Sequence, residues 1–257
     1  MSVGKVPEKM NLLVDYRKIE QIEEDQMRLL FETDRSCPIH LLYLESGQVP
    51  ARFQIKRMVI NFYHYILNQK EDSLLYRMLE AQVKLPVKGD FYETVKDIIE
   101  EFDISESTDI RSMNKNAFKR LVKEKCTKAA LDYLLEKQSR GSKGEGIKYE
   151  CLQMADYLMP QSNMSIKDQR ELFSIRCRTN KLGANRGIIE LCETNCGQIL
   201  NNSHIFKCEK LNENRPTKFD FDKVFNGYII EKKQHLKVWR ENHERREKIL
   251  RTQYNHC

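Results

Sequence analysis

Three cysteines and one histidine lie within seventeen residues near the C-terminus, in the pattern C-x3-C-x7-H-x3-C: Cys192, Cys196, His204 and Cys208. Three thiolates and one imidazole complete a tetrahedral shell, and a closed shell of this kind is typical of structural zinc sites. Because all four positions are filled by protein, none is left for a catalytic water. The pattern therefore predicts a structural Zn²⁺ site that constrains how this part of the chain folds.

The sequence around these ligands favours the same geometry. Gly197 directly follows Cys196 and allows the backbone to make a tight loop there. His204 and Cys208 are four residues apart, which places them on one face of a helix. Side chains that commonly cap a helix N-terminus come just before: Asn201, Asn202 and Ser203. We therefore expect a loop that carries two ligands, followed by a helix that carries the other two.

Chance clustering of buried thiols is the alternative, because free cysteine is among the most buried residue types. We interpret the other five cysteines as core or incidental thiols: Cys37, Cys126, Cys151, Cys177 and Cys257. The N-terminus has no continuous apolar segment and the longest apolar run is far too short for a bilayer span, so we expect an intracellular protein of the nucleus or cytoplasm, without a membrane partner. A reducing compartment favours metal binding over disulfides.

Glycine and proline are scarce, at ten and six of 257 residues, and strand-like alternation is nearly absent. The expected fold class is all-α, a multi-helix array with a small Cys3His zinc-stabilised segment near the C-terminus. Helices are predicted from apolar spacing and from Pro, Gly and capping residues at 38–46, 51–68, 72–82, 90–102, 114–138, 149–158, 165–179 and 228–252, with a short turn at 221–225. The flexible sequence near residue 142 and the loop at 181–187 are the expected domain boundaries.

Several catalytic signatures are missing from the sequence. It has no glycine-rich phosphate loop, no H-E-x-x-H, no G-x-S-x-G and no adjacent aspartates. Asp220 and Asp222 are interpreted as helix caps, and His64, which lies among aromatic residues, as a packed core histidine. We expect no catalytic residue, no enzymatic activity and no small-molecule substrate.

Positive charge is concentrated between Arg111 and Lys148, where eleven basic and four acidic residues give a net charge of +7. Lys115, Lys119 and Lys123 share one side of the predicted helix, and such a row can track a phosphate backbone. A second basic cluster precedes the zinc ligands. The predicted phosphate contacts are Lys115, Lys119, Lys123, Arg176, Arg178 and Arg186. An ordinary lysine-rich surface is the alternative.

Several segments, taken in order, resemble the region after the polymerase palm in reverse transcriptases of non-LTR (LINE-like) retrotransposons. They are Pro50 to Gln82, Asn114 to Lys125, Asp168 to Asn180 and the Cys192 to Cys208 cluster, whose C-x3-C has one residue more than the usual C-x2-C. The resemblance covers about residues 37 to 250. With the two boundaries above, the expected domains are an N-terminal extension (1–36), a helical domain (37–142) for which the resemblance implies thumb-like and following helices, a helical connector (143–187), a Cys/His zinc module (188–212) and a charged C-terminal helix (213–257).

The resemblance also implies nucleic-acid handling, because the C-terminal Cys/His region of that family is taken to contact template RNA or target DNA. The catalytic palm has no counterpart in this sequence. Two hypotheses remain open: a zinc-stabilised module that binds RNA or DNA, and a structural or protein-interaction remnant that binds no nucleic acid. In the second, the charged helix at 228–252 serves as a coiled-coil or docking surface.

Overall fold

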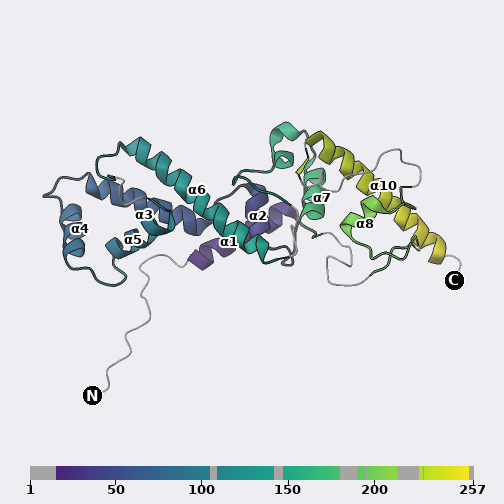
Figure 1. The fold of residues 1–257 in the computed structure, drawn as a ribbon, viewed down its shortest axis with the longest axis horizontal. Helices are drawn as coiled ribbons and strands as arrows, with labels where there is room; N and C mark the ends of the chain where they lie inside the picture. The colour runs from purple at the N-terminus through teal and green to yellow at the C-terminus, as the bar shows by residue number, and fades with distance from the viewer. Residues whose placement is uncertain are drawn as a thin grey trace, which may run out of the picture. The chain divides into compact units, whose positions relative to one another are not determined.

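The computed structural model describes residues 16–104, 109–141, 147–179, 190–194, 196–212, 226–227 and 229–254. Within these ranges the chain forms α-helices, two short 3-10 helices and no strand beyond one isolated bridge (Figure 1). The all-α prediction is therefore confirmed for the part of the chain that is described. None of the described helices is both long and apolar enough to cross a bilayer.

The α-helices agree with most of the predicted ranges. They are α1 (Tyr16–Phe31), α2 (Ile39–Ser46), α3 (Ala51–Leu67), α4 (Leu74–Lys84), α5 (Phe91–Glu101), α6 (Lys115–Ser139), α7 (Ile166–Arg176), α8 (Asn202–Lys207) and α10 (Ile229–Tyr254). Four of them start at a side chain that accepts a hydrogen bond from the N–H three residues on: Ser73, Asp90, Ser165 and Asn201. Gly47, with φ of +69°, ends α2 in the left-handed conformation that glycine adopts most easily. The predicted turn at 221–225 lies outside the described residues.

The helix predicted at 149–158 is wrong. Only Asp156–Leu158 is helical, as a 3-10 turn, η1, which is followed by a second turn, η2 (Pro160–Ser162). The segment before η1 crosses the end of α2, and a β-carbon built on Gly47 would lie 2.1 Å from the backbone nitrogen of Met154. Ala155 donates its N–H to the carbonyl of Glu45 at 2.8 Å. These long-range backbone contacts replace the local hydrogen bonds of a helix.

The described residues divide into two compact units. Unit 1 contains the residues up to Asp25 together with Val49–Tyr133, and unit 2 contains Gln26–Gln48 together with the residues from Leu134 onward. These divisions fall within α1 and α6, and the predicted boundary near residue 142 lies outside the described residues. α1 occupies part of the segment that was expected to be an N-terminal extension.

Each unit has its own buried apolar core. In unit 1, α3, α5 and α6 contribute Phe53, Ile60, Val95, Ile98, Phe118 and Val122. His64 is 5% exposed and its ring stacks on Phe118 at a centroid distance of 4.3 Å, so the interpretation of His64 as a core histidine is confirmed. In unit 2 the core includes Leu41, Leu42, Tyr157, Phe173, Ile205 and Trp239. Unit 2 also holds the Cys/His cluster.

Candidate metal centre and basic surface

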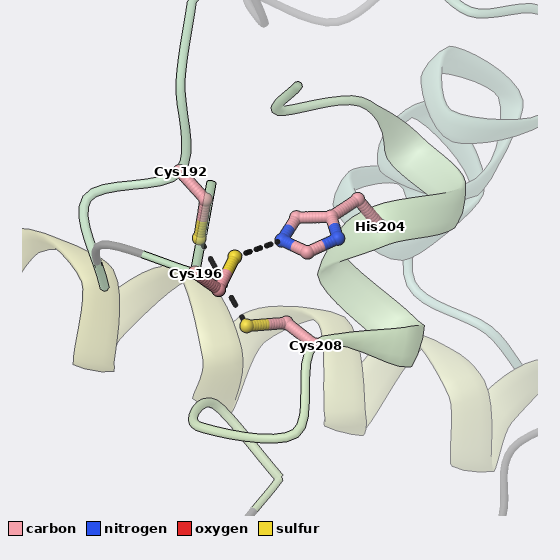
Figure 2. A group of neighbouring side chains, drawn as sticks. All are labelled: Cys192, Cys196, His204 and Cys208. Carbon is pink, nitrogen blue, oxygen red and sulfur yellow. Dashed lines mark hydrogen bonds between the residues drawn. The ribbon is translucent and has the colours of Figure 1, made fainter. Parts of the chain in front are cut away.

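The four predicted ligands converge in unit 2, and their ligand atoms all lie within 4.8 Å of one another. Figure 2 shows the four side chains pointing toward a common centre, two from the loop and two from α8 and its C-terminal end. The sulfur atoms of Cys192 and Cys208 are 3.9 Å apart, and Cys196 Sγ lies 3.2 Å from His204 Nε2. These four residues could hold a metal ion, as the spacing predicted.

The distances can be compared with those of a tetrahedral zinc site. Zinc–sulfur bonds of about 2.3 Å at tetrahedral angles separate two sulfurs by about 3.8 Å, and a sulfur and a nitrogen by about 3.5 Å. The Sγ atoms of Cys192 and Cys208, 3.9 Å apart, are close to the sulfur–sulfur value. The 3.2 Å between Cys196 Sγ and His204 Nε2 is slightly below the sulfur–nitrogen value. The donor set, three thiols and one imidazole, is also one that zinc prefers. The donor set and these two distances therefore fit a metal ion in a tetrahedral shell.

The loop that carries Cys192 and Cys196 is a short hairpin-like turn. Leu191 and Ile199 form an isolated antiparallel bridge, and Cys192 donates its N–H to the carbonyl of Gln198 at 2.9 Å. Gly197 has φ of +77°, which a residue with a side chain adopts only with strain. The turn thereby returns the chain so that both thiols face α8.

α8 positions the other two ligands. Asn201 caps this helix, because its side-chain oxygen accepts the N–H of His204 at 2.8 Å. Cys208 follows the helix and donates its N–H to the carbonyl of His204 at 2.7 Å. The hydrogen bond spans four residues, so the imidazole and the thiol lie one turn apart, as predicted.

The surroundings of the four side chains affect their hydrogen bonds and their pKa values. The hydroxyl of Thr194 lies 3.1 Å from Cys192 Sγ and 3.5 Å from Cys208 Sγ, so it can donate to a thiolate. Burial raises the pKa of Cys192 to about 11, which means that the charge of a bound cation is needed to hold this group as a thiolate. Burial lowers the pKa of His204, which keeps the imidazole neutral and able to coordinate.

α10 contacts both α8 and the loop that carries Cys192. Asn242 is fully buried and donates to the carbonyl of Ile205 at 2.9 Å. Arg246 pairs with Glu193 in the ligand loop at 2.5 Å. Trp239, the one tryptophan of the sequence, packs on Phe206 of α8 at a centroid distance of 5.7 Å. The order of the Cys/His cluster and the packing of α10 are therefore coupled through these contacts.

Some basic side chains of α10 pair with other elements of unit 2. Lys232 pairs with Asp156 at 2.6 Å, and Arg240 pairs with Asp168 and Glu171 of α7, both at 2.5 Å. The side of α10 that carries Lys232 and Arg240 is therefore packed against other parts of unit 2 and is not a free docking surface. The docking hypothesis stays a prediction for the exposed charged residues of this helix, which are Lys233, Lys237, Glu244, Glu247, Lys248 and Arg251.

The three predicted lysine contacts lie on the exposed side of α6. Lys115, Lys119 and Lys123 are all exposed, while Phe118 and Val122 on the opposite side are fully buried. No carboxylate within the described ranges pairs with any of these three ammonium groups. The structure thus brings them together in one row on unit 1.

Arg176 has a different environment and cannot serve as a phosphate contact. It is 3% exposed, and its Nη2 lies 2.9 Å from Oε1 of Glu45, which is fully buried. Tyr149 and Tyr157 donate their hydroxyls to the same carboxylate at 2.5 and 2.6 Å. Burial alone would raise the pKa of Glu45, but Arg176 and the two hydroxyls outweigh it and hold that pKa below its ordinary value. The prediction for Arg176 is wrong because its charge stabilises the interior.

The remaining two predicted contacts give less information. Arg178 follows α7, is partly buried and has φ of +53°. Arg186 lies outside the described residues.

Sequence reasoning did not identify Thr194, Asn242 or Glu45 as parts of these sites. Only Thr194 had a local signal, its position between two ligands; the partners of Asn242 and Glu45 are tens of residues away in the chain.

Comparisons with known proteins identify no relative. No protein-family model, no curated protein and no solved structure matches this chain.

Proposed function

We propose that this protein binds nucleic acid, RNA or DNA, through the basic side of α6, and that a Zn²⁺ ion held by the four ligands orders the C-terminal part of unit 2. The proposal assigns no catalytic step to the chain. It also takes the order of the four resembling segments as support for an origin in the C-terminal region of a non-LTR retrotransposon reverse transcriptase.

One observation carries the nucleic-acid part of the proposal, namely the row of lysines on α6. Lys115, Lys119 and Lys123 repeat every four residues, so their ammonium groups follow one side of the helix. Cations that are exposed and have no described carboxylate partner can neutralise phosphates and release condensed counterions. The buried residues on the other side of α6 fix which way the row faces.

The test is a salt titration of binding, measured by fluorescence anisotropy with labelled duplex DNA and single-stranded RNA. Affinity should fall as salt rises, by about 0.9 log units per log unit of salt for each phosphate contact on a duplex and about 0.7 on a single strand. Replacing Lys115, Lys119 and Lys123 together by glutamine should weaken binding at low salt and reduce the slope on duplex DNA by about 2 to 3.

A matched control separates location from net charge. Lys70, Lys84 and Lys88 are also exposed in unit 1, and their replacement by glutamine removes the same charge. The control variant should bind nearly as the wild type does. Equal losses of affinity in both triple variants would mean that binding depends on net charge and not on the lysine row of α6. Absence of binding by the wild type at low salt would refute the proposal.

A protein-interaction function is the second candidate, and exposed apolar side chains in unit 1 favour it. Leu74 and Met78 lie one turn apart on α4 and are 74% and 54% exposed, and Leu85 just after the helix is 77% exposed. If the wild type binds no nucleic acid, this surface becomes the better candidate.

A further inference from the structure

A cavity of about 470 Å³ lies in unit 1, between α3 and the segment that leads into α6. Its volume falls in the range of sites that bind small ligands. The residues that matter for its chemistry are Asn61, His64 and Tyr65 from α3, and Arg111, Lys115 and Lys119 from the other side. Cations, aromatic rings and amides therefore face one space.

The basic side of the cavity suits a phosphate. Lys115 is the first residue of the 25-residue helix α6, whose N-terminal end carries partial positive charge, and Lys119 follows one turn later. Arg111 adds a third cation. Its side chain is about half exposed, and its pair with Glu71 at 3.2 Å is a surface contact of little stability, so the guanidinium can turn to a phosphate.

The α3 side of the cavity presents an aromatic face. Tyr65 is 50% exposed and its ring lies nearly parallel to that of Phe62, with centroids 6.1 Å apart and an angle of 18°. Phe62, 45% exposed, is in turn held edge-on by Phe91 at 5.8 Å and 74°. Half-exposed aromatic rings fixed in this way are stacking platforms for unpaired bases.

The cavity wall also contains an unsatisfied acceptor. The side-chain oxygen of Asn61 is buried and has no hydrogen-bond partner among the described residues. A buried acceptor of this kind is costly unless a donor reaches it. This oxygen is shielded from solvent, so the exocyclic amine of a base or a ribose hydroxyl can supply the donor only after the Asn61 amide turns toward the cavity.

We propose that this cavity holds one nucleotide of a single-stranded nucleic acid, with the phosphate on Lys115, Lys119 and Arg111 and the base stacked on Tyr65. The inference rests on the proposed nucleic-acid binding and names its substrate class. A base can enter such a cavity only when it is unpaired, which excludes an intact duplex. Lys123 continues the basic row on α6 and Phe62 continues the aromatic surface, so a strand, rather than a free nucleotide, matches the whole track.

The experiment measures binding of the full chain to a labelled single-stranded 12-mer, to the matching duplex and to uridine monophosphate as competitor. Tyr65→Ala should weaken single-strand affinity by about 5- to 100-fold, the size of one lost stacking contact, and should leave duplex affinity within about twofold. Tyr65→Phe keeps the ring and should bind as the wild type does. Leu74→Ala, which truncates a more exposed apolar side chain outside the cavity, is the control.

Crosslinking supplies a readout that does not depend on a variant. Irradiation of the wild type bound to a 4-thiouridine 12-mer should attach RNA to the tryptic peptide Met58–Lys70, which contains Tyr65. Unchanged single-strand affinity of Tyr65→Ala, or crosslinks only outside this peptide, would overturn the inference and leave the proposed function standing. Displacement of the 12-mer by micromolar uridine monophosphate would reassign the cavity to free nucleotides. Absence of all binding by the wild type would refute the proposed function as well.

Discussion

Replacing Arg176 by methionine would leave the carboxylate of Glu45 buried without its cation. Glu45 is fully buried and Arg176 is 3% exposed, so neither charge can recover its hydration in the folded state. Breaking a buried pair by removing one partner costs about 3–5 kcal/mol. The hydroxyls of Tyr149 and Tyr157 still donate to the carboxylate, so we expect the lower part of that range.

Urea unfolding followed by the fluorescence of Trp239 measures this loss, because that residue is the sole tryptophan and is buried in unit 2. The loss corresponds to a fall in the unfolding midpoint of about 1 to 2 M urea. The double variant with Glu45→Gln removes both charges and should regain part of the loss. Nucleic-acid affinity of Arg176→Met at low urea should not change. A midpoint shift below about 0.3 M would mean that Arg176 does not stabilise the buried carboxylate of Glu45.

The same pair predicts a pH dependence. The pKa of Glu45 is held below its ordinary value of 4.5, so its stabilising contribution is present above pH 4.5 and is lost as the pH falls through the lower, folded-state value. The difference in stability between the wild type and Glu45→Gln should therefore shrink below pH 4.5. Acid also protonates the metal ligands, but it does so in both proteins, and the difference isolates Glu45. A difference that stays constant down to pH 3 would contradict this assignment.

Three further predictions concern the metal centre and two turns. Cys208→Ser should no longer bind one metal ion per chain, and should lose much of the roughly 10–16 kcal/mol that structural zinc supplies in small modules. Exposure of Trp239 would then shift its fluorescence to the red, and an unshifted spectrum would contradict this prediction. Gly47→Ala should lower the free energy of unfolding by about 3 kcal/mol or more, because the new β-carbon would lie 2.1 Å from backbone atoms. Gly89→Ala, where φ is +84° but the space is open, should lower it by about 1 to 2 kcal/mol. Equal losses in thermal unfolding would contradict the close approach at Gly47. Asn201→Ala should cost about 1 kcal/mol and weaken metal affinity about fivefold against a competing chelator; unchanged affinity would show that the cap does not position His204.

The helices and the metal ligands were predictable because their signals are local. Apolar spacing and the caps at Ser73, Asp90 and Ser165 mark helix starts within a few residues. The four ligands lie within seventeen residues, so a loop and one short helix suffice to bring them together. Local chain geometry alone therefore determined the candidate metal centre.

The features that the sequence did not reveal depend on distant contacts. Arg176 resembles a surface cation in sequence, since its partner Glu45 lies 131 residues earlier. α1 was missed because its buried side includes a charge, Glu20, which pairs with Arg52 of α3 at 2.5 Å. The basic and aromatic sides of the cavity come from separate helices, and neither alone indicates a pocket. Tertiary pairing, which no local pattern encodes, decided each of these cases.

Native mass spectrometry of the intact protein at near-neutral pH shows whether Cys192, Cys196, His204 and Cys208 hold a zinc ion. We expect a mass increase of one zinc ion per chain in the wild type, and its absence in Cys208→Ser. A metal-free wild type whose tryptophan is nonetheless buried and whose C-terminal region resists protease would contradict the claim that zinc orders this part of unit 2.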